Sequence, residues 1–201
     1  DSIEKVILYN MVLSDKIKTE EYSKIAKEWK ETIAKINKYP ELPLDQNGQP
    51  YYSFVAEFKY LTKDKLFNRS LEWLSINYKL FPSYLYSNIE DGKIIYSISF
   101  DLKNNHTCDY IGVISIKNEK ILIEFARIEY QKFIPGHYSS ETWITDQTIQ
   151  FGVKEIFPVI LKKPSEWLLY LNMLKTTNEH FYDEANNLSD YINNYDSSYQ
   201  F

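Results

Sequence analysis

The spacing of hydrophobic positions changes at Thr62, and this change marks the best-defined segment of the chain. From Tyr52 to Tyr60, apolar residues alternate with polar ones, which is the two-residue period of a strand with one wetter face. From Leu66 to Tyr78, apolar residues recur at helical spacing, and Thr62 is suited to cap the N-terminus of that helix. The pattern therefore predicts a strand that passes directly into a helix.

Downstream of this helix, alternating patterns predict antiparallel strands joined by short connections. The four expected strands lie at 84–89, 94–102, 110–116 and 120–130. Asp91-Gly92 is the dipeptide preferred in a two-residue type I′ turn, Asn118-Glu119 is the second expected turn, and 103–109 is expected to be a polar loop. These segments predict a meander, whereas 133–163 shows no clear period beyond a turn at Pro135-Gly136.

The N-terminal part is expected to be a helical extension. Apolar residues recur on one helical face from Thr19 to Lys38, and residues 4–13 favour a strand. A connector then follows, marked by Pro40, Pro43, Gly48 and Pro50. The pattern predicts an N-terminal extension at 1–45 with one amphipathic helix, and a single α+β domain at 50–195.

A long helix is expected near the C-terminus, with Ser165 as its N-cap. Its inward-facing residues are predicted to be Trp167, Leu168, Leu171, Leu174, Phe181, Ala185, Leu188 and Ile192. Because Asn178 lies on this otherwise apolar face, a bend or break is expected at 176–178. The polar tail at 193–201 is expected to fray.

The order of strand, helix, meander and helix predicts an α+β fold in which helices cover one face of an antiparallel sheet. With 201 residues, 44% of them hydrophobic, the chain can bury one substantial core. Its 18 tyrosines favour strands, and several of their rings are expected at the rim of the core with the hydroxyl in water. A net charge of −5 opposes nucleic-acid binding, and no apolar run is long enough to span a membrane.

Few residues offer catalytic or metal-binding chemistry. His106 and Cys108 could supply two metal ligands, but a structural zinc site needs four, and the pair also fits an ordinary loop-to-strand junction. Cys108 as a nucleophile would need a base such as His137 or His180, which the spacing does not indicate. We therefore assign no catalytic, cofactor-binding or metal-binding residue and expect no cofactor.

Acidic residues also occur on the predicted strands, at Glu57, Glu124 and Glu129. A pair such as Glu57 and Glu124 could face each other for acid–base catalysis, but acids that alternate with apolar residues are typical of the solvated face of a sheet. No glycine-rich phosphate-binding motif occurs. Arg69 and Arg127 are too few to form the basic surface that a nucleic acid requires.

Several segments resemble a domain family of unknown function that has a TATA-binding-protein-like fold. They are the strand FVAEF, the helix start KDKLFNRSLEWL with Leu66, Arg69 and Trp73, the strand DGKIIYSISF, and the strand pair YIGVISIKNEKILIEFARIEY. The resemblance covers residues 50–132 and implies the order β-α-β-β-β-β-α. The family recurs in exported proteins of Bacteroides-type bacteria and carries no assigned catalytic residues, and Asn118-Glu119 stands where a glycine-containing turn is expected.

These observations predict a non-enzymatic, exported module that binds another protein or a small ligand through its open sheet face or through 133–163. The chain starts at Asp1 without a methionine, so we expect that a signal peptide or a deliberate truncation accounts for the start, and the expected location is periplasmic, cell-surface or secreted. The alternative is a hydrolase whose site is assembled by folding from scattered residues, in a pocket that gathers at least two of Glu57, Glu124, His106, Cys108 and His137. The partner and the oligomeric state stay open.

Overall fold

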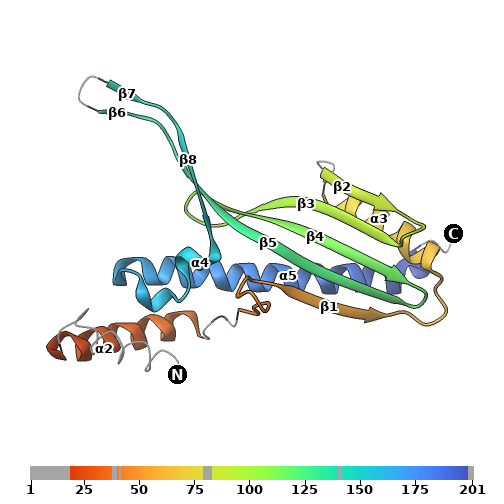
Figure 1. The fold of residues 1–201 in the computed structure, drawn as a ribbon, viewed down its shortest axis with the longest axis horizontal. Coiled ribbons are helices and arrows are strands. Elements are labelled where there is room, and N and C mark those ends of the chain that lie inside the picture. The colour runs from red at the N-terminus through yellow and green to blue at the C-terminus, as the bar shows by residue number, and fades with distance from the viewer. Residues whose placement is uncertain (1–18, 38–39, 41, 79–82, 140–141, 199–201) are drawn as a thin grey trace. The chain divides into compact units, whose positions relative to one another are not determined.

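The structure is a computed structural model, and it describes residues 19–37, 40, 42–78, 83–139 and 142–198 (Figure 1). The chain divides into two compact units. The helical unit comprises Asp1–Glu41 and Lys154–Thr176, and the sheet unit comprises Leu42–Val153 and Thr177–Phe201. The strand expected at 4–13 lies outside the described residues, and the predicted domain limits stay a prediction.

Twelve helices and strands and one 3-10 turn follow one another along the described residues. They are α2 (Thr19–Ile36), β1 (Tyr52–Glu57), α3 (Lys63–Asn77), β2 (Ser83–Asn88), β3 (Lys93–Asp101), β4 (His106–Lys117), β5 (Lys120–Ile134), β6 (His137–Ser139), β7 (Thr142–Ile144), β8 (Gln147–Gly152), α4 (Val153–Ile156), the 3-10 turn Val159–Leu161, and α5 (Pro164–Ser198). No helix among these residues is long and apolar enough to cross a membrane.

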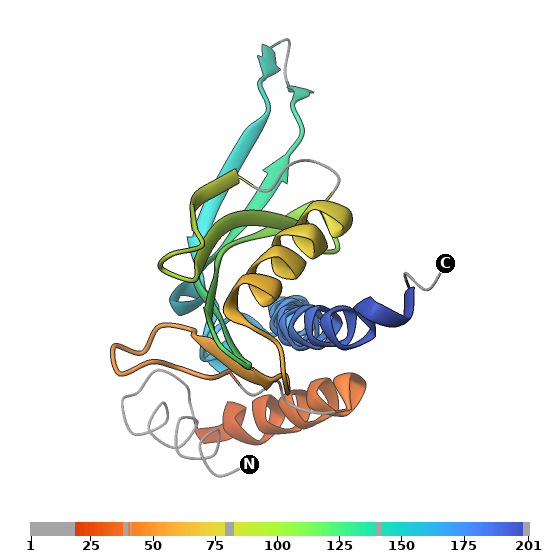
Figure 2. The same ribbon diagram turned by 90° about the vertical axis from the view of Figure 1, so that its right-hand side faces the viewer.

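The sheet unit contains an antiparallel sheet in the order β1-β5-β4-β3-β2, and β8 pairs with the second half of β5. Along β4, every second residue is buried, which places one face of the sheet against helices α3 and α5 (Figure 2). This arrangement confirms the predicted α+β fold with an antiparallel meander and helices on one face.

Local sequence signals explain the junction between β1 and α3. The Thr62 hydroxyl accepts a hydrogen bond from the Lys65 amide at 3.4 Å, so Thr62 caps α3 as predicted. The strand is shorter than its pattern suggests, because β1 ends at Glu57 and Tyr60 is 88% exposed with a φ of 67°. The turn at Tyr60 therefore interrupts the alternation before the helix begins.

The hairpin predicted at Asp91-Gly92 has a longer loop than expected. Asn88 pairs with Lys93, which leaves four loop residues, and only Gly92 among them has a positive φ. The Asn88 side chain accepts a hydrogen bond from the Glu90 amide at 2.7 Å, so an Asx-type turn replaces the two-residue turn. The two-residue turn at 118–119 is confirmed by the pairing of Lys117 with Lys120.

The prediction of a polar loop at 103–109 was wrong in length: the loop is shorter, because β4 already begins at His106. Asn104 and Asn105 both adopt positive φ, and this short connection returns the chain into β4. The His106 ring is buried, and its Nδ1 lies 2.7 Å from the Asn104 carbonyl oxygen. Polar residues at 103–109 therefore include a buried strand start that composition alone did not reveal.

Helix α2 in the helical unit matches its pattern and ends at Ile36, where Asn37 follows with a φ of 65°. Its Trp29 is buried and meets the Trp167 ring edge to face, with centroids 5.0 Å apart. The Trp167 indole nitrogen donates to the Lys162 carbonyl oxygen at 2.9 Å. These contacts anchor the two apolar faces that the sequence pattern predicted.

Helix α5 departs from prediction at three points. It continues as one helix through 176–178, because Thr177 and Asn178 both bind tyrosine hydroxyls from the sheet and so satisfy their polar groups inside the apolar face. Leu168, predicted inward, is 39% exposed. The tail does not fray from residue 193, since Tyr195 donates to Glu72 of α3 at 2.8 Å and α5 extends to Ser198.

Candidate functional site

The five residues of the predicted hydrolase site do not gather in one place. His106 and Cys108 are buried on the helix-facing side of β4, whereas Glu57 and Glu124 lie on the opposite face of the sheet. His137 is exposed on β6. No three His, Cys, Asp or Glu side chains within the described ranges form a group that could hold a metal ion.

The two acids predicted for acid–base work have structural partners. Glu57 forms an ion pair with Lys120, with an N···O distance of 3.1 Å, and both side chains are at least half exposed. Glu124 accepts a hydrogen bond from the Tyr51 hydroxyl. Both acids lie on the solvated face of the sheet, as is typical of acids that alternate with apolar residues along a strand.

Cys108 is unsuited to nucleophilic chemistry in the folded chain. Its side chain is fully buried, and burial raises the pKa of its thiol well above the ordinary value. A hydrogen bond with Thr177 opposes this increase only in part. The thiolate required of a nucleophile is therefore not populated near neutral pH.

We expect Cys108 to react with a thiol-specific reagent such as DTNB at pH 8 only after unfolding. The native chain should release less than a tenth of the thionitrobenzoate that the same chain releases in guanidinium. Complete reaction of the native chain within minutes would contradict the buried position of this thiol. The same assay reports whether a variant is folded.

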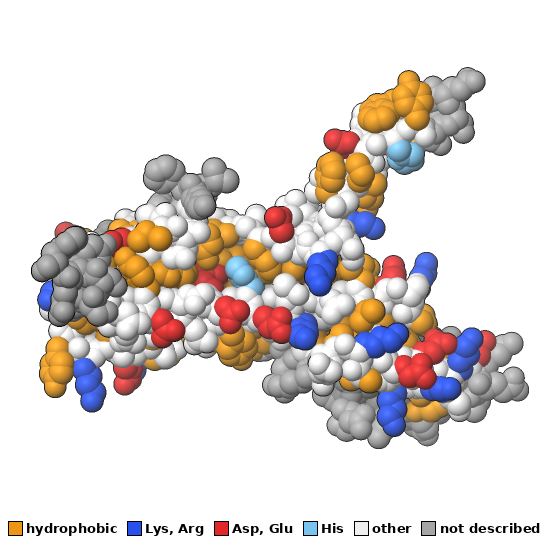
Figure 3. All heavy atoms as spheres, turned by 180° about the vertical axis from the view of Figure 1, so that it is seen from behind, with side chains coloured by type: hydrophobic (Ala, Val, Ile, Leu, Met, Phe, Trp, Pro, Cys, Tyr) orange, Lys and Arg blue, Asp and Glu red, His pale blue; other side chains and the backbone are white. Residues whose placement is uncertain are grey.

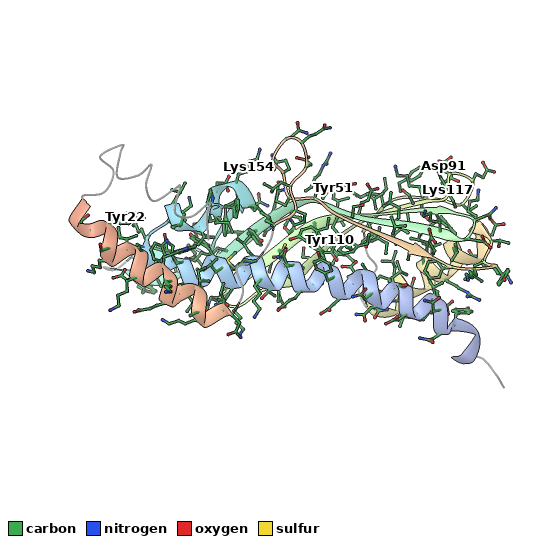
Figure 4. The ribbon with its side chains drawn as sticks, turned by 90° about the horizontal axis from the view of Figure 1, so that it is seen from below. Tyr22, Tyr51, Asp91, Tyr110, Lys117 and Lys154 are labelled. Carbon is green, nitrogen blue, oxygen red and sulfur yellow. The ribbon has the colours of Figure 1, made fainter. Side chains whose placement is uncertain are left out.

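A buried polar cluster, which the sequence did not reveal, joins α5 to the sheet. We call it the tyrosine cluster, and it consists of Tyr96, Tyr110, His180 and Glu184. Tyr96 donates to the Glu184 carboxyl group at 2.7 Å, Tyr110 donates to its other oxygen, and His180 Nε2 lies 3.3 Å from that oxygen. Figure 4 shows the labelled Tyr110 where the sheet meets α5.

Burial and the neighbouring Glu184 carboxyl group both raise the pKa values of Tyr96 and Tyr110. The two hydroxyls therefore stay protonated and act as donors. Gly112 of β4 makes room for this arrangement, since a Cβ there would overlap the Tyr96 ring. Phe100 stacks on the His180 ring with centroids 3.8 Å apart and covers one side of it. Each group thus has a partner, which is typical of a cluster that fixes helix packing.

A β ribbon that the sequence pattern missed carries four of the exposed large apolar side chains of the sheet unit. This ribbon, called the arm, comprises residues 129–152: the second half of β5, β6, β7 and β8. Glu129 pairs with Gly152 at its base, and Tyr138 pairs with Trp143 near its end. The arm extends away from the rest of the sheet (Figure 1).

A bulge explains why the arm leaves the sheet. Between Ala126 and Glu129, the register of β5 against β4 shifts, and Arg127 in this stretch has a φ of 51°. Bulges bend and twist the strand that contains them. Below the bulge β5 pairs with β1 and above it with β8, while residues 129–132 of β5 still pair with 106–109 of β4, so the base of the arm remains part of the sheet.

The arm exposes large apolar side chains on both of its faces. Tyr138 is 75% exposed, Trp143 54%, Ile149 48% and Phe133 45%. Figure 3 shows hydrophobic side chains along the arm. Between β5 and β8, the Gly136 amide donates to the Asp146 side chain at 2.7 Å. A ribbon with aromatic side chains in water is a candidate interaction surface.

The open face of the sheet, the other predicted surface, is more mixed. Val55 at its edge is 59% exposed, but its neighbours Leu122, Val113 and Ile95 are only partly exposed. Glu124 lies among them and is bound by Tyr51. The arm is therefore the stronger candidate.

No protein-family model matches the chain, and no curated protein matches it. Two solved structures are similar. A TBP-like protein from Parabacteroides distasonis has a TM-score of 0.53 and 20% identity, over 76% of this chain and 97% of that one. A DUF4468 family protein from Bacteroides ovatus has a TM-score of 0.48 and 13% identity, over 73% of this chain and 90% of that one. The similarity to the TBP-like protein shows that the chain has a TBP-like fold, as the sequence resemblance implies.

Proposed function

We propose that this protein is a non-enzymatic, exported interaction module that binds another protein through its arm. The observation that carries the proposal is the exposure of Tyr138, Trp143, Ile149 and Phe133 on one β ribbon. Aromatic side chains are enriched in protein interfaces because they bury a large area at a low cost in conformational entropy. Fold similarity contributes nothing to this choice, since one fold hosts many functions.

The geometry of the arm favours a protein over a small ligand. Small ligands occupy concave sites that enclose most of their surface, whereas a two-stranded ribbon presents two open faces and its edges. Beyond the pairing of Lys132 with His106, the described part of the arm has only two strands side by side, and a two-stranded ribbon is marginally stable in water unless further strands or a packed face support it. A protein partner would cover the exposed faces and would stabilise the ribbon at the same time.

A photo-crosslinking amino acid in place of Tyr138 tests this proposal in the source cells. We expect a discrete covalent adduct from this position, because the side chain is 75% exposed at the end of the arm. The matched control is the same replacement at Tyr60, which is 88% exposed at the end of β1 and outside the arm. Adducts at both positions, or at neither, would remove the arm as the binding surface.

A further inference from the structure

One edge of β8 has no strand against it among the residues that the structure describes. β8 pairs with β5 on one side, and β1 pairs with the other half of β5. The outer edge of residues 147–151 therefore presents backbone amide and carbonyl groups outward, as edge strands do. Such an edge is a template for one kind of occupant, which is another extended strand.

This edge lacks the features that protect most edge strands. Lysine, proline or an inward-pointing charge usually blocks edge pairing, but the segment QTIQF at 147–151 contains no charged residue and no proline. On the paired side, the β5 residues opposite 147–151 are 130–134, of which only Lys132, opposite Ile149, is charged. The outer edge of β8 therefore has backbone groups available for pairing and no charged side chain of its own that would oppose it.

The lack of charge favours a second copy of the same chain. In a two-fold dimer, the residue at the axis faces itself, so any charge there would meet a like charge. The chain as a whole carries a net charge of −5, yet 147–151 is neutral. The neutral outer edge of β8 therefore allows two copies of the chain to pair, whereas like charges on most of the acidic surface would repel each other.

We propose that β8 pairs antiparallel with β8 of a second copy, about a two-fold axis beside Ile149. The pairing joins the strands β4, β5 and β8 of one copy to those of the other in one continuous sheet. Ile149 of one copy then contacts Ile149 of the other, and this contact covers a residue that is 48% exposed in the single chain. The antiparallel alignment also carries Tyr138 and Trp143 of each arm toward the base of the other arm.

This inference rests on the proposed function, because it names the partner that the arm binds. Pairing over one short strand buries a small area, so we expect a weak dimer whose population rises with concentration. Sedimentation equilibrium of the unmodified chain should show a mass that rises from 24.0 kDa toward twice that value. A mass that stays at the monomer value at the highest soluble concentration would overturn the inference.

Two substitutions separate this edge from other surfaces. Ile149→Lys places like charges together at the axis, and the dimer dissociation constant should rise at least tenfold. Val55→Lys adds the same charge at a 59% exposed position of β1 and should leave the constant within twofold. Gln150→Lys serves as a second edge variant, and protection of Cys108 from DTNB identifies the folded variants. Equal effects of Ile149→Lys and Val55→Lys would contradict β8 pairing.

Cysteine substitution tests the register. Facing residues of antiparallel strands have Cα atoms about 4.5–5.5 Å apart, which a disulfide can bridge. Ile149→Cys should therefore form a disulfide-linked dimer at least tenfold faster than Val55→Cys, whereas native Cys108 is buried and stays reduced. Thr148→Cys and Gln150→Cys locate the axis if it lies one residue away. No acceleration at any of the three positions would overturn the pairing.

The outcomes also distinguish this inference from the proposed function. A Tyr138 adduct with a different protein, together with a monomeric chain, would leave the interaction module in place and would remove self-pairing. An adduct of twice the chain mass, together with the Ile149→Lys effect, supports both. The absence of any adduct and of any dimer would remove both.

Discussion

Replacing Glu184 by alanine is expected to lower the free energy of unfolding by about 3–5 kcal/mol. Glu184 is 5% exposed, and its carboxyl group accepts hydrogen bonds from the hydroxyls of Tyr96 and Tyr110. Its removal leaves the buried Tyr96 hydroxyl without this acceptor, leaves the Tyr110 hydroxyl with His180 Nε2 at 3.3 Å, and opens a cavity between α5 and the sheet. Urea denaturation followed by circular dichroism measures the change.

Two further variants show whether the loss comes from the tyrosine cluster. Glu184→Gln retains an oxygen that can accept one hydroxyl, so a smaller loss of about 1–2 kcal/mol is expected. Asp183→Ala removes a negative charge from the adjacent, exposed position of α5 and should change stability by less than about 0.5 kcal/mol. Similar small losses for Glu184→Ala and Asp183→Ala would show that the cluster does not fix the helix.

Replacing Phe181 by alanine is expected to cost about 3–5 kcal/mol by removing the central ring between α5 and the sheet. Phe181 is fully buried and stacks on Phe125 with centroids 4.6 Å apart and planes 16° apart. Tyr52 and Tyr110 lie 4.8 and 4.9 Å from the same ring. The cavity would therefore remove contacts with three rings at once.

Tyr182→Ala is the matched control, because Tyr182 is the next residue on α5 and is 55% exposed. Its ring meets Phe54 at 5.1 Å, so a loss of about 1 kcal/mol is expected from that contact. The denaturation midpoint of each variant gives the comparison. A loss for Phe181→Ala no larger than that for Tyr182→Ala would contradict the central position of this ring.

The tyrosines account for much of the difference between sequence and structure. Several were expected at the rim with wet hydroxyls, and Tyr60, Tyr138 and Tyr182 are indeed exposed. Four others, however, are fully buried, and their hydroxyls bind polar groups of α5; they are Tyr52, Tyr96, Tyr110 and Tyr130. A tyrosine can occupy a core when its hydroxyl has a partner, and the sequence does not show that partner.

Arg69 of α3 illustrates the same limit on inference from sequence. It is one of only two arginines in the sequence, yet its side chain is buried, donates to the Ile192 carbonyl oxygen at 3.1 Å and lies over the Tyr195 ring at 4.3 Å. These contacts join α3 to the end of α5. They also explain why the polar tail that was expected to fray is helical instead.

The sequence pattern predicts those helices and strands whose two sides differ in burial. β1, α3, β3 and the hairpin of β4 and β5 each have one buried and one exposed side, so their periods of two or 3.6 residues appear in the order of residues. The arm exposes apolar residues on both faces, so no alternation develops there. This is why 133–163 could be proposed as a binding segment but could not be recognised as a ribbon.

Which residues far apart in the sequence come into contact depends on how the helices and strands pack against one another. Glu184 lies 88 residues from Tyr96 and 74 from Tyr110 along the chain, and their contact depends on the register of α5 against β3 and β4. The free edge of β8 likewise depends on the sheet order, which places β1 and β8 along different halves of β5. Local periodicity reports burial of one element at a time, whereas register and strand order arise from packing between elements.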